Sequence, residues 1–173
     1  MAKEDRILIV DDEIVIRELM VDILSDEGFS VSSAPNGRAA LELLEKQNDF
    51  VVLFTDIMMP EMDGIELIRR ARKVRPSIVP IVMTGFATLE TARAAVKEGA
   101  YDYVLKPFSL SEVKLAVSNA LDRAKLQFEN ARLQELTEIF SISQSMANIR
   151  DEFELHEFVL ESALRQVGAQ RGS

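Results

Sequence analysis

The chain has 173 residues, of which 47% are hydrophobic and 28% charged, so it can bury a core and is not disordered by composition. Its formal net charge of -9 argues against nucleic-acid binding by this segment, and the lack of cysteine excludes disulfides and thiolate metal sites. No apolar run is long enough to span a membrane, and the charged start MAKEDR does not resemble a signal peptide, so we expect a cytoplasmic protein.

Five short apolar runs recur at regular intervals along the chain, at residues 7–10, 29–34, 50–55, 78–84 and 101–105. Three of them are nearly continuous in apolar and β-branched residues, as in strands buried on both faces of a parallel sheet. The run at 29–34 instead alternates in polarity, which is typical of a half-exposed edge strand.

Segments with helical spacing separate these runs. The first is the clearest, because its apolar residues fall at intervals of three and four before the stop at Gly28: Ile16, Leu19, Met20, Ile23 and Leu24. This alternation is a (βα)5 pattern. It predicts right-handed crossovers and a doubly wound, five-stranded parallel sheet in the flavodoxin-like order 2-1-3-4-5.

The fifth helix has a clear start and no early end. Ser109 and Glu112 match the S-x-x-E capping box, no proline follows Pro107, and no glycine occurs before Gly168. A helix from Ser111 to about Asn148 would be about 38 residues and roughly 57 Å long. We therefore expect a long C-terminal helical extension to the sheet domain.

A heptad pattern marks this extension. Apolar residues seven apart define one seam position, and two residues occupy the interleaved position: Leu126, Leu133, Phe140 and Ala147, then Leu136 and Ser143. Glu129 interrupts the seam. A solvated helix packed on its own domain is the alternative, but the pattern favours a parallel coiled coil and hence a homodimer.

Polar residues follow four of the predicted strands at their carboxyl ends, where ligands bind in open parallel sheets. In chain order they are Asp11 and Asp12, Asp56, Thr84 with Gly85, and Lys106 with Pro107. Each one alone could be a helix cap, a turn residue or a solvated lysine. All of them at one edge indicate a functional site.

The charges of this cluster indicate its chemistry. Two carboxylates about 5 Å apart repel by roughly 3 kcal/mol at an effective dielectric constant near 20, so three need a cation besides Lys106. Oxygen ligands favour Mg²⁺ over zinc, which prefers His or Cys. Asp56 could cap a helix, bind a metal ion or act as a nucleophile. The lysine and threonine favour a nucleophile that forms an acyl phosphate.

Four motifs in order, LIVDDE (8–13), TDIMMPEMDG (55–64), MTG (83–85) and YVLKPF (103–108), resemble the receiver domain of two-component response regulators over residues 5–124. The resemblance implies that a histidine kinase or phosphotransfer protein phosphorylates Asp56. It further implies Mg²⁺ binding by Asp12, Asp56 and the Met58 carbonyl, with assistance from Asp11. Thr84 and Lys106 are then expected to contact the phosphoryl group, and the Lys106-Pro107 peptide to be cis. Tyr103 is expected to be the aromatic switch residue.

The remainder resembles a signalling helix that leads into the first helix of a GAF-type domain. We therefore divide the chain into a receiver domain (1–124), a helical linker (125–150) and the start of a further, truncated domain (151–173).

The function expected is a phosphorylation-activated switch that catalyses only its own phosphorylation and dephosphorylation. One alternative is an aspartyl-phosphate hydrolase, but such enzymes commonly carry a second acid where Met58 stands. The other is a constitutive dimerisation scaffold with a vestigial acidic site.

Overall fold

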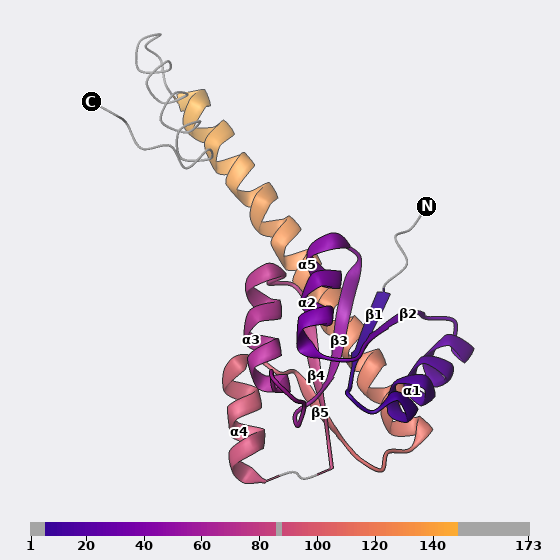
Figure 1. Ribbon diagram of the computed structural model, residues 1–173. Coiled ribbons are helices and arrows are strands. Elements are labelled where there is room, and N and C mark those ends of the chain that lie inside the picture. Colours follow the sequence, from indigo (N-terminus) through magenta and orange to yellow (C-terminus); the bar gives the residue numbers. More distant parts are fainter. Residues whose placement is uncertain (1–5, 86–87, 149–173) are drawn as a thin grey trace. The chain divides into compact units, whose positions relative to one another are not determined.

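The computed structural model describes residues 6–85 and 88–148, in which strands and helices alternate (Figure 1). The strands are β1 (Arg6–Val10), β2 (Ser30–Ala34), β3 (Phe50–Asp56), β4 (Val79–Thr84) and β5 (Asp102–Leu105). The helices are α1 (Ile14–Asp26), α2 (Gly37–Lys46), α3 (Gly64–Val74), α4 (Leu89–Glu98) and α5 (Leu110–Asn148). These bounds lie close to those predicted from the sequence.

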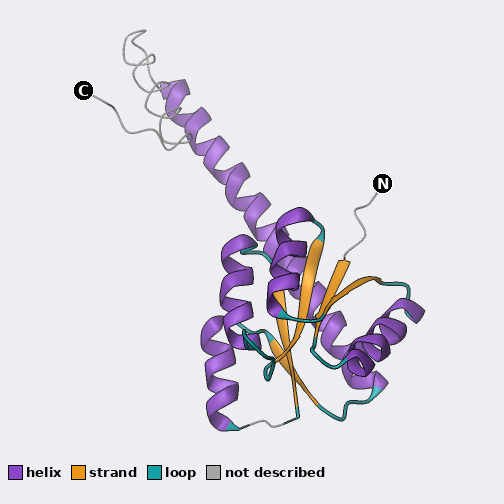
Figure 2. Cartoon of the chain, viewed as in Figure 1, coloured by secondary structure: helices purple, strands orange, loops and turns teal. Residues whose placement is uncertain are grey.

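The five strands form one parallel sheet in the order β2-β1-β3-β4-β5, which confirms the predicted topology (Figure 2). Every residue of β4 is buried, whereas β2, at one edge, is mostly half-buried, as its alternating sequence predicts. The order places β3 at the centre, so Asp56, its last residue, lies between the ends of β1 and β4.

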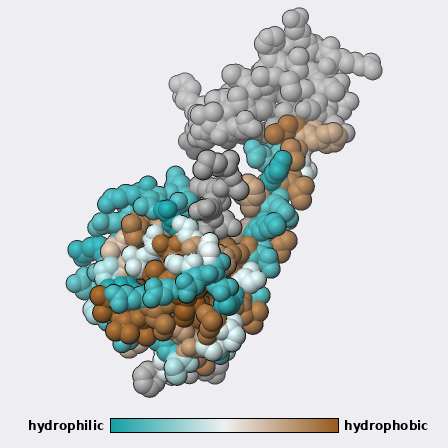
Figure 3. Space-filling model, turned by 90° about the vertical axis from the view of Figure 1, so that its right-hand side faces the viewer, coloured by the Kyte–Doolittle hydropathy of each residue, from teal (hydrophilic) through white to brown (hydrophobic). Residues whose placement is uncertain are grey.

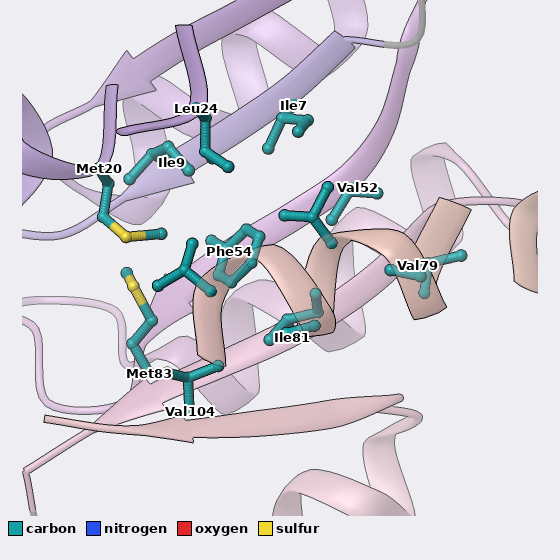
Figure 4. Packing of buried hydrophobic residues seen from close by; sticks show 14 residues of the cluster. Ile7, Ile9, Met20, Leu24, Val52, Phe54, Val79, Ile81, Met83 and Val104 are labelled. Atoms are coloured by element: carbon teal, nitrogen blue, oxygen red, sulfur yellow. The ribbon is translucent and has the colours of Figure 1, made fainter. Parts of the chain in front are cut away.

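Helices cover both faces of the sheet. Successive strand residues point to opposite faces, so each strand contributes side chains to two separate cores. In β1, Ile7 and Ile9 face α1 and α5, while Leu8 and Val10 face α2 and α3. Figure 4 shows the first of these cores, in which Phe54 lies among side chains from neighbouring strands and from α1. The sheet is thus held from both sides, and its carboxyl edge carries the polar residues.

Helix α5 starts at the predicted capping box. The Ser109 N–H donates to Glu112 Oε2 at 2.7 Å, and the Glu112 N–H donates to Ser109 Oγ at 3.3 Å. These bonds satisfy helix N–H groups that would otherwise lack partners, and those from Ser109 hold the pKa of Glu112 below its ordinary value. Further along, α5 buries one side against the sheet through Val113, Ala116, Val117 and Ala120.

The chain divides into two compact units, Met1–Gln127 and Phe128–Ser173, and the boundary lies within α5. In the second unit three apolar seam residues are solvent-exposed, with 60% of Leu133, 53% of Leu136 and 64% of Phe140 accessible. Apolar surface, brown in Figure 3, is accordingly visible on this helix among hydrophilic residues. The predicted GAF-type helix lies outside the described residues, and the domain limits stay predictions.

Among the described residues, no helix combines the length and the apolar character needed to cross a membrane.

Candidate functional site

The carboxyl ends of three strands bring the predicted charged residues together. Asp11 follows β1, Asp56 ends β3 and Lys106 follows β5. Because the strands are parallel, these ends share one edge of the sheet. Residues almost a hundred positions apart in the sequence therefore meet at a single site.

The centre of the site is the Lys106 ammonium, whose Nζ lies 2.6 Å from Asp11 Oδ2 and 3.0 Å from Asp56 Oδ2. The Asp11 side chain is fully buried, and those of Asp56 and Lys106 are only 10% and 14% exposed. Water screens such a buried pair much less than a surface ion pair. Lys106 thus compensates part of the negative charge of two acidic groups at once.

Burial and pairing shift the pKa values in this cluster. Burial raises the pKa of Asp11, and the hydrogen bonds from Lys106 and from the Glu13 N–H only partly oppose this. Burial alone would lower the pKa of Lys106, but hydrogen bonds to both carboxylates raise it above its ordinary value. Lys106 is therefore a cation at neutral pH, whereas burial disfavours the ionised form of Asp11 in the folded state.

The donor set of the site fits a hard divalent cation. One carboxylate oxygen each from Asp11, Asp12 and Asp56 lies within 4.8 Å of the other two. An octahedral Mg²⁺ holds neighbouring ligand oxygens about 3 Å apart and opposite ones about 4.2 Å apart, so each oxygen would need to move by about 1 Å at most. Asp12 is exposed, which leaves the ion a path from solvent. Three carboxylates with one lysine need this extra positive charge.

Thr55 and Gly64 fix the backbone around Asp56. The buried Thr55 hydroxyl donates to the Asp56 carbonyl oxygen at 2.9 Å. The same oxygen would lie 2.0 Å from a Cβ atom at Gly64, so only glycine lets α3 begin this close to the strand end. A glycine in a loop motif indicates such close contact, but it does not identify the neighbour.

The structure places the other predicted residues around the acidic pair. The Met58 N–H lies 3.4 Å from Asp56 Oδ1, and the Met58 side chain is 72% exposed; the metal-binding role of its carbonyl stays a prediction. The Lys106-Pro107 peptide is cis, as expected. The Lys106 N–H donates to the Thr84 carbonyl at 2.8 Å, which links the ends of β4 and β5.

A hollow of about 200 Å³ adjoins the end of β4. Its lining includes Thr84, which is buried, and Tyr103, which is 56% exposed, together with apolar residues of α4 such as Ala95 and Val96. The hollow thus connects a hydroxyl at the edge of the sheet with an aromatic side chain that lies mainly in solvent. Such an arrangement can couple the acidic site to the surface formed by α4 and β5.

Comparison with known proteins identifies the family of the chain. The family profile of the response regulator receiver domain matches residues 7–118, more than half of the chain. The chain is 40% identical over 149 residues to the regulatory protein AtoC of Escherichia coli K12, covering 86% of this chain and 32% of AtoC. It is 33% identical over 150 residues to a cyclic di-GMP phosphodiesterase of Thermotoga maritima, covering 86% of this chain and 40% of that protein.

A solved structure gives the same answer for the fold. A CheY-like response regulator receiver domain protein from Methanospirillum hungatei JF-1 superimposes with a TM-score of 0.68 at 33% identity, over 71% of this chain and 98% of that one. The chain spans about a third of the length of the curated relatives it matches. The names of these relatives differ, so their output functions do not transfer to this chain.

The raised pKa of Asp11 predicts that Asp11→Asn stabilises the metal-free protein at pH 7. A carboxyl whose pKa is higher in the folded than in the unfolded chain favours folding below the unfolded value, near 3.8, and loses this contribution as the pH rises through the folded value. We expect Asp11→Asn to melt a few degrees above wild type at pH 7 with chelator present. The difference should shrink as the pH falls towards about 3.

Asp22→Asn is the matched control, because Asp22 is an exposed acid on α1. A surface change of this kind should alter the free energy of unfolding by less than about 0.5 kcal/mol. An Asp11→Asn protein that melts below wild type at pH 7 would show that the bond from Lys106 outweighs the cost of burying the carboxylate.

Proposed function

The chain belongs to the response regulator receiver domain family, and on this premise we propose that Asp56 is its phosphoryl acceptor. A receiver domain is a phosphorylation-activated switch of a two-component system, and this chain has that class of function. The observation that carries the proposal is the Lys106 ammonium, which binds both Asp11 and Asp56 at the edge of the sheet. An ion pair that served stability alone would not need a third carboxylate beside it.

In the proposed step, an Asp56 carboxylate oxygen attacks the phosphorus of a phosphohistidine on a histidine kinase or phosphotransfer protein. The O–P bond that forms gives an acyl phosphate. The P–N bond of the donor breaks, and its imidazole leaves with the electron pair and takes up a proton. Such transfer depends mainly on positioning and charge compensation, which a nucleophile held between a lysine and two further acids can provide.

Mg²⁺, when bound, supplies positive charge to the phosphoryl oxygens during transfer. We assign its binding to the carboxylates of Asp11, Asp12 and Asp56 and to the Met58 carbonyl. Lys106 holds its proton at neutral pH, since hydrogen bonds raise its pKa, and is the donor we assign to a phosphoryl oxygen. The Thr84 hydroxyl is the second donor.

The proposed response to phosphorylation runs through Thr84 and Tyr103. A phosphoryl group adds about two negative charges at Asp56, and these attract the Thr84 hydroxyl. Tyr103 then turns from solvent into the hollow that both residues line. This movement alters the surface of α4, β5 and α5, which is the surface we assign to output.

We further propose that α5 carries the output and forms a homodimer. The support is its exposed apolar seam, which includes Leu133, Leu136 and Phe140 and would be covered in a parallel coiled coil. The limits of the receiver domain (1–124), the helical linker (125–150) and a GAF-type segment (151–173) belong to the same proposal.

We assign no external substrate to this chain, because Met58 stands where aspartyl-phosphate hydrolases commonly carry a second acid. It catalyses only its own Mg²⁺-dependent phosphorylation and dephosphorylation in the cytoplasm. The net charge of -9 argues against nucleic-acid binding by this segment.

Intact mass spectrometry tests the acceptor. With acetyl phosphate and Mg²⁺, wild type should gain one phosphoryl group, and Asp56→Asn should gain none because it lacks the nucleophilic carboxylate. Chelation of Mg²⁺ should abolish the gain in wild type. Asp63→Asn is the matched control: its side chain caps α3 by accepting from the Glu66 N–H at 2.7 Å, and asparagine can do the same. A wild-type chain that stays unmodified, or an Asp56→Asn chain that gains the group, would refute the assignment.

Sedimentation velocity tests the dimer. Leu133→Glu places a charge in the proposed seam and should convert a wild-type dimer into a monomer. Phe128→Glu changes another exposed apolar residue of the same helix, 72% accessible and outside the seam, and should leave the dimer intact. A monomeric wild type at about 100 µM, a concentration at which a micromolar dimer would form, or equal effects of the two substitutions, would rule out this coiled coil.

A further inference from the structure

Arg17, in the first turns of α1, binds the main chain beside the acidic site. Its Nη1 donates to the Asp11 carbonyl oxygen at 2.7 Å and to the Asp12 carbonyl oxygen at 3.0 Å. These are the two residues whose carboxylates, with Asp56, form the candidate metal site. Arg17 therefore contacts the segment that carries two of three ligands, but it does so through main-chain atoms.

The segment that Arg17 binds is a short connection without regular structure. β1 ends at Val10 and α1 begins at Ile14, so the carbonyls of Asp11 and Asp12 follow the strand and precede the helix. The N-cap of α1, Glu13, makes no side-chain capping bond. The Asp11 Oδ1 atom accepts the Glu13 N–H at 3.0 Å instead. The Arg17 guanidinium thus provides a hydrogen-bond donor for both main-chain carbonyl groups of this connection.

Two effects of Arg17 on a bound cation oppose each other. Its positive charge repels the ion, so a purely electrostatic role predicts that removing Arg17 tightens binding. Its hydrogen bonds hold the Asp11-Asp12 peptide in one orientation, so a positioning role predicts that removal weakens binding. Groups that orient metal ligands typically change affinity by about 10-fold to 100-fold when they are lost. The two roles therefore differ in the sign of the result.

We propose that Arg17 is a positioning residue for the metal site: by binding the carbonyls of Asp11 and Asp12, it orients their carboxylates for a divalent cation. This inference rests on the proposed function, because it concerns the Mg²⁺ that phosphorylation requires. The rigid, permanently charged guanidinium suits the role, since one nitrogen already reaches both carbonyl oxygens. Positioning outweighs repulsion because a misoriented ligand is lost to the ion, whereas solvent at the exposed Asp12 screens the guanidinium charge.

The test measures the Mg²⁺ Kd of the full chain by isothermal titration calorimetry. Arg17→Met, which removes charge and hydrogen bonds, should raise the Kd about 10-fold or more. Arg17→Lys, which keeps the charge on a shorter side chain, should fall between Arg17→Met and wild type. Arg38→Met is the matched control, because it removes an exposed arginine whose contact is an ion pair with Glu61, and it should leave the Kd unchanged.

Two further readouts separate positioning from a general loss of structure. At saturating Mg²⁺, Arg17→Met should be phosphorylated by acetyl phosphate at nearly the wild-type rate, because its two bonds go to main-chain atoms and not to the reacting carboxylate. In the metal-free protein, the Glu13 amide should exchange its hydrogen faster in Arg17→Met, while amides of β1 keep wild-type protection.

An unchanged or lower Kd in Arg17→Met would overturn the inference, whatever the rate of phosphorylation at saturating Mg²⁺. If Arg17→Met does not fold, Arg17→Lys decides the question, since a wild-type Kd in that variant also overturns it. A wild type that binds no Mg²⁺ and takes up no phosphoryl group would instead refute the proposed function. A wild type that does both, beside variants with the same Kd, refutes the role of Arg17 alone.

Discussion

The contact of one ammonium group with two carboxylates determines much of this structure. Lys106 can reach Asp11 and Asp56 together only if the ends of β1, β3 and β5 lie at one edge of the sheet. The strand order meets this condition, because β3 lies beside β1 and only β4 separates it from β5. The apolar side chains that bury the strands on both faces therefore also bury the charges at their ends.

Burying these acidic groups lowers the stability of the folded chain but creates a site that can bind a divalent ion. Buried carboxylates disfavour the folded state unless cations compensate them, and the raised pKa of Asp11 is a sign of that cost. A single lysine cannot neutralise three acids. The remaining negative charge gives the site its affinity for a divalent ion, which the chemistry on Asp56 then uses. Residues that fix the main chain, such as Gly64 beside the Asp56 carbonyl, keep these charges in place.

Most of the fold and the acidic residues of the site could be predicted from the sequence, because both leave local patterns. The five apolar runs, the edge character of β2 and the capping box at Ser109 each depend on residues within a few positions of one another. The contacts of Arg17 and the closeness of Gly64 to Asp56 could not be predicted, since they depend on the path of the backbone between elements. The exposed seam of α5 is a different case: its pattern was visible, but a dimer depends on a second chain.

The most direct test of the account is to locate the phosphoryl group. After reaction with acetyl phosphate and Mg²⁺, borohydride reduction converts an acyl phosphate on aspartate into homoserine, which peptide mass spectrometry can assign to one position. The account predicts homoserine at position 56 in wild type and its loss when Mg²⁺ is chelated. Homoserine at position 11 or 12, or the same yield without Mg²⁺, would contradict the claim that the Lys106-bridged carboxylate is the metal-dependent acceptor.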